Sequence, residues 1–260
     1  MKNKTEQTNK TLPLVLLRHG QSTYNKNNRF TGWTDADLTD EGVKQAHAAA
    51  ALLKKEGLSF NEAHTSVLKR AIRTQWLVLD DMDLMWIPQT STWRLNERCY
   101  GAVQGFDKTE LSKKYDEAAV LGWRKRFSAK PPALERNDRR HPCHDPRYAL
   151  LGKAEHPSSE SLEDVHNRVL PYWNRQLAPS LRQGKRVLVC ASHHSLRSLV
   201  MILDRLTPDE IERITIPLGI PLVYELPQNT LKPQSHKYLG NPKAVEKAIN
   251  AIAGQGKLSK

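Results

Sequence analysis

Arg18, His19 and Gly20 directly follow an apolar segment, Leu14 to Leu17, and could together act on a phosphate group. A neutral imidazole is a good nucleophile near pH 7, and an arginine offers a planar fork of donors to phosphate oxygens. Glycine lets the backbone approach a phosphate closely. The tripeptide therefore favours attack of His19 on phosphorus, although a core histidine at a strand end would give the same three letters.

Later residues offer the other groups that phosphoryl transfer requires. Three cations could hold phosphate and carboxylate oxygens: Arg18, Arg70 and Lys108. Neutral donors could complete the site: Gln21, Ser22, Asn25, Thr31 and Gly32. Glu97 is the candidate general acid and base, because transfer to or from a hydroxyl needs a proton carrier. Its alternative role is an ion pair with Arg98 or Arg94.

These residues lie within an ordered set of motifs that runs through most of the chain. The set comprises Arg18-His19-Gly20-Gln21-Ser22, Phe30-Thr31-Gly32-Trp33, Leu68-Lys69-Arg70-Ala71, Asn96-Glu97-Arg98, Glu160-Ser161-Leu162 and Ser195-Leu196-Arg197. It closely resembles the cofactor-dependent phosphoglycerate mutases of the histidine phosphatase superfamily. The resemblance covers about residues 13 to 258.

The resemblance implies an enzyme of glycolysis and gluconeogenesis that interconverts 3-phosphoglycerate and 2-phosphoglycerate, which are small phosphorylated substrates. In that family a phosphohistidine, here at His19, is primed by 2,3-bisphosphoglycerate, and no metal takes part. The resemblance favours the catalytic role of Glu97, and the family suggests a homodimer. Carried over onto this chain, further substrate contacts are Arg98, Tyr100, Arg124 and Lys125, which stands where the family usually has a second arginine.

The segment Ala191-Ser192-His193-His194-Ser195-Leu196-Arg197 departs from the family pattern Ala-His-Gly-Asn-Ser-Leu-Arg. An ungapped alignment places Ser192 at the second catalytic histidine, which normally donates hydrogen bonds to the transferring phosphoryl group. His193 and His194 then replace glycine and asparagine and are counted among the substrate contacts. His193 could supply the missing donor if the turn shifts by one residue. Cys99 likewise replaces a histidine.

Three functions therefore stay open at the level of sequence. The first is an active mutase in which His193 stands in for the second histidine. The second is a phosphatase of the same superfamily that acts on a phosphorylated metabolite. The third is a weakened or inactive homologue that binds phosphorylated ligands or a protein partner, which the change at Ser192 favours most.

Composition limits the class of ligand and compartment. The net charge is +12, but many arginines fall within the phosphate motifs, so we expect an anionic small substrate and no nucleic acid. No apolar run approaches the roughly 18 residues of a membrane span. The first residues do not resemble a secretory signal, and Cys99, Cys143 and Cys190 form no disulfide framework, which predicts a cytoplasmic protein. His141, Cys143 and His144 lack the remaining ligands of a zinc site.

Expected strands and helices alternate along the chain. This order predicts an α/β fold, with a mostly parallel sheet flanked by helices on both faces. Expected strands include Leu14 to Leu17 and Arg186 to Ala191. Expected helices follow Thr39, run from about Leu68 to Leu79 and from Leu162 to Leu177, start at Ser195, and begin again at Asn241-Pro242. Arg124 to Tyr148 is expected to form an ordered loop or lid. His19 and residues 192–194 should meet where the strands end, since open α/β sheets bind ligands there.

The predicted boundaries give a single domain over residues 13–253. A disordered polar extension is expected at residues 1–12, and a mobile tail at residues 254–260.

Overall fold

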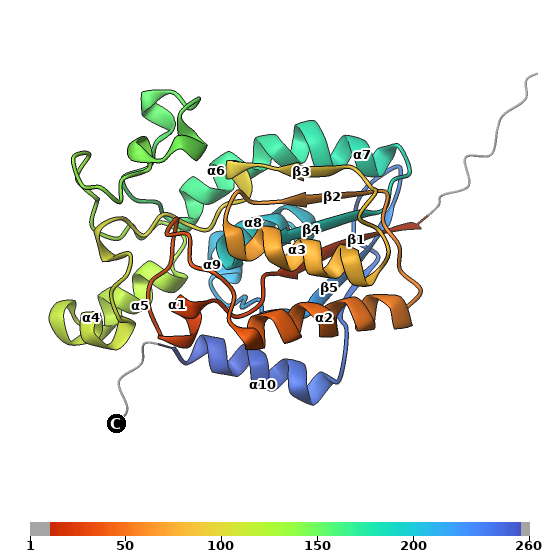
Figure 1. The fold of residues 1–260 in the computed structure, drawn as a ribbon, viewed down its shortest axis with the longest axis horizontal. Coiled ribbons are helices and arrows are strands. Elements are labelled where there is room, and N and C mark those ends of the chain that lie inside the picture. The colour runs from red at the N-terminus through yellow and green to blue at the C-terminus, as the bar shows by residue number, and fades with distance from the viewer. Residues whose placement is uncertain (1–10, 256–260) are drawn as a thin grey trace, which may run out of the picture.

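The computed structural model describes residues 11–255, and a six-stranded sheet lies at the centre of this part of the chain (Figure 1). In spatial order the strands are β3 (Gln89–Ser91), β2 (Glu62–Thr65), β4 (Val187–Ala191), β1 (Thr11–Arg18), β5 (Pro221–Pro227) and β6 (Ser235–Tyr238). The pairs from β3 to β1 are parallel, whereas β5 and β6 pair antiparallel. The predicted α/β class is confirmed, with an antiparallel edge that the sequence analysis does not anticipate.

Five of the longer helices in residues 11–255 correspond to those expected from the sequence, although the one expected at Ser195 begins at His193. The two helices between residues 108 and 125 and the short helices are not predicted from the sequence. The longer ones are α2 (Asp40–Lys55), α3 (Lys69–Asp81), α4 (Lys108–Tyr115), α5 (Glu117–Lys125), α6 (Leu162–Tyr172), α8 (His193–Asp204) and α10 (Pro242–Ala253). The shorter ones are α1 (Thr23–Lys26), α7 (Ala178–Arg182) and α9 (Pro208–Ile211). Thr39 and Asn241 cap α2 and α10 through their side-chain oxygens. None of the helices within residues 11–255 is both long and apolar enough to cross a membrane.

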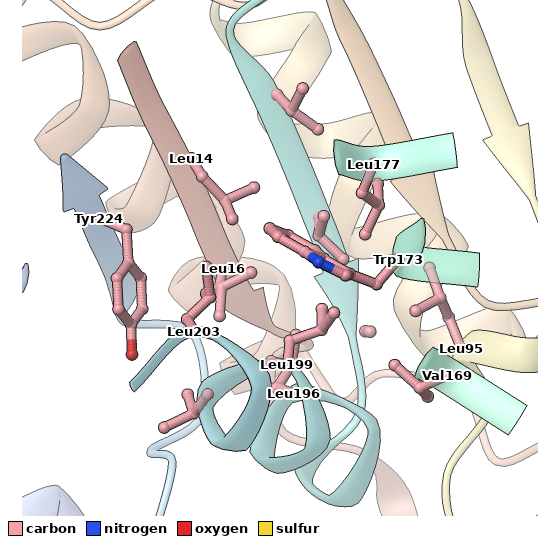
Figure 2. Packing of buried hydrophobic residues seen from close by; sticks show 14 of the residues in the cluster. Leu14, Leu16, Leu95, Val169, Trp173, Leu177, Leu196, Leu199, Leu203 and Tyr224 are labelled. Atoms are coloured by element: carbon pink, nitrogen blue, oxygen red, sulfur yellow. The ribbon is translucent and has the colours of Figure 1, made fainter. Parts of the chain in front are cut away.

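Alternate residues of β1 face opposite sides of the sheet, and both sides are buried, which explains the apolar run. Leu14 and Leu16 pack against α6 and α8, in the cluster shown in Figure 2. Val15 and Leu17 pack against α2 and α3 in a second cluster. Helices therefore cover both faces, as predicted, and the two layers fix the position of the strand ends.

The chain between β3 and α6 forms a separate lobe of short helices and turns beside the sheet (Figure 1). The loop expected from Arg124 to Tyr148 starts inside α5 and contains two 3₁₀ turns, Pro142–His144 and Pro146–Tyr148. The long helix expected up to Leu177 changes into a π-helical turn at Trp173–Leu177 before α7. Pro171 lies just before this turn and has no amide to donate, which explains a local change in the hydrogen-bond ladder.

The expected N-terminal boundary is wrong by two residues. Thr11 and Leu12 belong to β1 and pair with Pro227 and Leu226 of β5. Leu12 is buried, and removing its apolar side chain from water lowers the free energy of the folded chain. At the other end, Gln255 holds a defined contact described below, although a mobile tail is expected from residue 254. Residues 1–10 and 256–260 lie outside the described residues.

Candidate active site

His19 lies just after β1, where the parallel strands end, and is held by three hydrogen bonds. Its amide donates to the carbonyl of Ala191 at 3.0 Å, which ties it to the end of β4. Its Nδ1 lies 2.7 Å from the carbonyl of Gly20, and Nε2 lies 3.1 Å from Nε of Arg70. The carbonyl can only accept and the guanidinium can only donate, so Nδ1 carries the proton and Nε2 carries a lone pair.

The charge state of His19 suits a nucleophile. Burial, Arg70 and Arg18 lower the pKa of His19 well below its usual range. The imidazole is therefore neutral at pH 7, with Nε2 as the nitrogen able to attack.

Arg70 is fully buried in the first turn of α3 and is fixed in position by its other donors. Nη1 donates to the carbonyl of Thr34 at 3.0 Å, and Nη2 donates to the carbonyl of Gly32 at 2.9 Å. Gly32 has φ of +55°, a left-handed conformation that favours glycine. A Cβ at Gly20 would collide with the backbone of Gly42, so close packing also requires glycine next to the nucleophile.

A cavity of about 60 Å³ opens at the end of β1, where Arg18, the residue before His19, forms part of its wall. A buried water needs roughly 10–15 Å³ of such space, so the cavity suits a small polar ligand. Its wall includes six cations and one carboxylate, Glu97. The cations are Arg18, Arg29, Lys108, Arg124, Lys125 and Arg197. This excess of positive charge favours a ligand with more than one anionic group.

Most of the substrate contacts predicted from the sequence line this cavity. They are Arg18, Asn25, Thr31, Tyr100, Lys108, Arg124, Lys125, His193 and His194, together with Glu97. The following residues do not line it: His19, Gln21, Ser22, Gly32, Arg70, Arg98 and Ser192. Gln21 instead accepts from Thr39 at the start of α2, and Ser22 caps α1. The guanidinium of Arg98 lies 5.0 Å from the ring of Tyr100.

The strand-to-helix turn after β4 places residues 192 and 193 differently. Ser192 is the N-cap of α8 and is buried, with its amide bonded to Ser195 Oγ at 3.3 Å. His193 lines the cavity, and its Nε2 is buried without a hydrogen-bond partner among residues 11–255. Burial and Arg18 lower the pKa of His193 well below its usual range. His193 thus offers a neutral imidazole to a ligand.

Glu97 is bound by backbone and ring donors and not by the side chains of Arg94 or Arg98. Its Oε1 accepts from the amide of Arg98 at 2.7 Å and lies 2.7 Å from Nδ1 of His194. Burial raises the pKa of Glu97, but His194, the Arg98 amide and Arg18 together hold it well below its usual range. The ion pairs considered from the sequence are therefore not formed, and Glu97 is available to a ligand.

Cys99 faces away from the cavity. It packs with Trp33 and Tyr148, and its amide donates to Glu160 Oε2 at 2.8 Å. Burial raises the pKa of its thiol to about 12, so the thiol is neutral at pH 7. The residue that replaces the family's histidine therefore fills the core behind the site.

A buried ion pair holds the backbone that carries Glu97. Arg168 Nε donates to Glu160 Oε1 at 2.7 Å, and Nη2 donates to Glu160 Oε2 at 3.0 Å. The same guanidinium donates to the carbonyls of Arg94, Asn96 and Glu97. Both side chains are 6% exposed, so the pair is shielded from water.

Replacing Arg168 by methionine is expected to lower the free energy of unfolding by about 3–5 kcal/mol, because it leaves Glu160 buried and unpaired. Urea denaturation measures the change. The double variant Glu160→Gln, Arg168→Met should recover part of the loss, since it removes the uncompensated charge. A loss below about 1 kcal/mol in the single variant would show that water reaches the pair.

The C-terminal end of α10 forms part of the cavity wall, a position that is not predicted from the sequence. Ile252, Ala253 and Gln255 line it. The Nζ of Lys108 donates to Gln255 Oε1 at 2.9 Å, and Arg124 donates to the carbonyl of Ile252 at 3.0 Å. Other lining residues without a predicted role are Arg29, Phe30, Arg197, Ile214 and Thr215.

Lys108 gives the site a measurable pH dependence. Burial, Arg124 and Arg18 lower the pKa of Lys108 to about 7. Its charge is present below that pH and is lost above it, whereas a phosphate ester is a dianion above about pH 6. The protonated fraction of Lys108 falls about fivefold from pH 7 to pH 8, so we expect the Kd for 3-phosphoglycerate to rise by up to about fivefold over this range.

Titration calorimetry at a series of pH values measures this dependence. Lys108→Arg keeps its charge throughout and should bind with a nearly constant Kd over the same range. An equal pH dependence in both proteins would assign the effect to another group.

Comparison with known proteins identifies the family. The model of the histidine phosphatase superfamily, branch 1, matches residues 14–230, and the chain belongs to this superfamily. The superfamily predicted from the motifs is thus confirmed. Its members transfer phosphoryl groups, as phosphatases or mutases.

Solved structures share the fold. A provisionally assigned alpha-ribazole-5'-P phosphatase from Escherichia coli has a TM-score of 0.66 and 21% identity, over 89% of this chain and 97% of its own. A mycobacterial glucosyl-3-phosphoglycerate phosphatase, in complex with VO3, has a TM-score of 0.63 and 23% identity, over 82% of this chain and 92% of its own. At these identities the likeness concerns the fold.

Proposed function

We propose that this protein moves a phosphoryl group through a phosphohistidine at His19, taking it from a small phosphorylated acid of the phosphoglycerate class. The observation that carries the proposal is the cavity beside His19, where six cations surround a single carboxylate. A phosphate monoester needs only part of that charge. The remaining cations suit a second anionic group on the same ligand, such as a carboxylate or a second phosphate.

The chemical step follows from the state of the side chains. Nε2 of His19 attacks phosphorus, and the P–O bond to the substrate breaks as the N–P bond forms. Arg70 and Arg18 balance the charge of the phosphoryl oxygens. Glu97 gives a proton to the leaving oxygen and takes one from the hydroxyl that later accepts the phosphoryl group. None of these steps calls for a metal ion.

Return of the phosphoryl group to a hydroxyl of the same acid, as in a mutase, is the reaction we favour. It requires that water be kept from the phosphohistidine, and the end of α10, bonded to Lys108 and Arg124, forms one wall of the cavity and supports such shielding. The motif resemblance supports the same reaction, with 2,3-bisphosphoglycerate as the primer and as the intermediate. Glycolysis and gluconeogenesis would be its metabolic setting.

Hydrolysis of the phosphohistidine by water is the second candidate. Ser192 stands where the mutases have a second histidine, so the phosphoryl group is less firmly held in this chain. The two solved structures of similar fold compared above are phosphatases by their descriptions, which supports this candidate.

Two assays on the same preparation separate these reactions. Coupled formation of 2-phosphoglycerate from 3-phosphoglycerate is measured with and without 2,3-bisphosphoglycerate, and release of inorganic phosphate is measured in parallel. A mutase forms 2-phosphoglycerate faster when primed and releases little phosphate. A phosphatase releases phosphate at a rate that exceeds isomer formation, and a protein without either activity contradicts the proposal.

Restoring the missing histidine is expected to accelerate phosphoryl transfer. In the double variant Ser192→His, His193→Gly, a donor returns to position 192 and the ring at 193 no longer competes for space. Loss of one such donor commonly costs about 10² to 10³-fold, so the gain should be readily measured as the rate of His19 phosphorylation. His193→Gly alone is the control and should not accelerate the reaction. If it abolishes transfer, His193 already supplies the donor.

A further inference from the structure

His194 makes hydrogen bonds with both ring nitrogens, and both partners are oxygen acceptors. Nδ1 lies 2.7 Å from Glu97 Oε1, and Nε2 lies 3.0 Å from the carbonyl of Arg124. A neutral imidazole has one N–H and can satisfy one acceptor. Both bonds form only if the pair holds one more proton, either on His194 or on the carboxyl of Glu97.

We infer that His194 and Glu97 share one proton, so that Glu97 delivers it to the substrate while His194 keeps it available. His194 is then a positioning residue that acts through Glu97. The shared proton stands on the geometry alone, whereas its use in catalysis rests on the proposed function.

The position of the pair supports this role. Glu97 and His194 both line the cavity, and both are buried, with 6% and 2% of their surface exposed. The amide of His194 also donates to Oε1 at 3.3 Å, as does the amide of Arg98 at 2.7 Å. Three nitrogen atoms thus converge on one oxygen of Glu97, and the other oxygen takes part in none of these three bonds. That oxygen is left to contact a ligand, and it carries the shared proton to the ligand once the carboxyl group has turned about its Cγ–Cδ bond.

Charged and titratable groups surround the pair on all sides. They are Arg18 after the core of β1, Arg98 and Tyr100 from the segment after β3, Arg124 from α5, and His193 and Arg197 from α8. Burial raises the pKa of Glu97, but His194, the amide of Arg98 and Arg18 hold it well below its usual range. Without a shared proton the carboxylate would be ionised and could not act as an acid.

Neither group alone would hold the proton at pH 7, so the shared proton depends on the two hydrogen bonds of His194. Burial and Arg98 lower the pKa of His194 to about 4, while Glu97 opposes this change. A proton held between two weak bases passes readily to a developing alkoxide. When the P–O bond of the substrate breaks, Glu97 protonates the leaving oxygen, and the pair is left one proton short. The hydroxyl that next attacks phosphohistidine returns that proton.

The pH dependence of kcat/KM tests the catalytic use. His194→Asn, which introduces the residue of the family pattern, leaves Glu97 among cations without a proton partner. We expect the basic limb to move down by about one pH unit or more, with at least about a tenfold loss at pH 7.5 that recovers at lower pH. His166→Asn is the matched control and should keep the parent profile. His166 lies on α6 and is hydrogen-bonded to Ser198 of α8, the helix that also carries His194. A loss in His194→Asn that is equal at every pH would overturn the inference, since it indicates a merely structural role.

A second measurement does not depend on any substrate. In ¹⁵N-histidine NMR and infrared spectra of the whole protein at pH 7, we expect either a doubly protonated His194 or a protonated Glu97. Glu97→Gln should remove this proton and leave His194 neutral. An ionised Glu97 beside a His194 with bare Nδ1 in the parent protein contradicts the inference, whatever reaction the enzyme performs.

Discussion

The variant His19→Ala takes up no phosphoryl group from 2,3-bisphosphoglycerate, whereas the parent protein does. This is the expected result because Nε2 of His19 carries a lone pair and is held 3.1 Å from Nε of Arg70, and because His19 directly follows Arg18, which lines the cationic cavity. Removing a nucleophile from a catalytic unit costs on the order of 10⁴ to 10⁶ in turnover. Intact-mass spectrometry at neutral or alkaline pH, where phosphohistidine survives, detects the label.

The control for this experiment is a histidine outside the site. His47 lies on α2, partly exposed and paired with Asp81, and His47→Ala should take up the label like the parent. Label in His19→Ala at the parent's rate would mean that another side chain is phosphorylated and that the assignment of the nucleophile is wrong.

Replacing Glu97 by glutamine should slow transfer from 3-phosphoglycerate or 2,3-bisphosphoglycerate by about 10² to 10⁴-fold. An amide cannot deliver a proton to the leaving oxygen, and an alkoxide is a poor leaving group. A donor such as p-nitrophenyl phosphate leaves as a stable anion without a proton. Its rate of phosphorylating His19 should therefore change by less than about tenfold in the same variant.

The comparison of the two donors separates chemistry from structure. If Glu97→Gln loses the same factor with both donors, the carboxylate positions Arg98 or His194 and does not carry protons. Circular dichroism and urea denaturation of the variant check that the fold is kept.

The sequence predicts those site residues whose position in the fold is determined by residues next to them in the chain. His19 lies at a strand end because Leu14 to Leu17 form a buried apolar run, and Arg18 and Gly20 come with it. Lys108, Tyr100 and Arg124 were expected from the family motifs, and the structure brings them to one cavity. The tautomer of His19 can be assigned only from the distances of its ring nitrogens to Gly20 and Arg70, and no sequence motif provides these distances.

The parts that the sequence does not predict depend on contacts distant along the chain. Ile252 and Gln255 reach the cavity only because α10 runs back along α2 to the end of the sheet that carries the site (Figure 1). Neither residue type suggests phosphate chemistry. The two hydrogen bonds of His194 likewise cannot be predicted from the sequence His193-His194, because both rings line the cavity and only the fold decides which of them contacts Glu97.

The buried arginines beside the cavity also affect the protein as a whole. Arg70 and Arg197 are almost completely buried, and burial lowers the pKa of Arg197 to about 9 and that of Arg18 to about 10. A lowered pKa in a buried base means that its charge costs the folded state free energy. Any anion that binds there offsets this cost and stabilises the folded chain by mass action. The thermal stability of the protein is thus tied to the anions in solution, and a cell rich in phosphorylated metabolites would hold it in its more stable form.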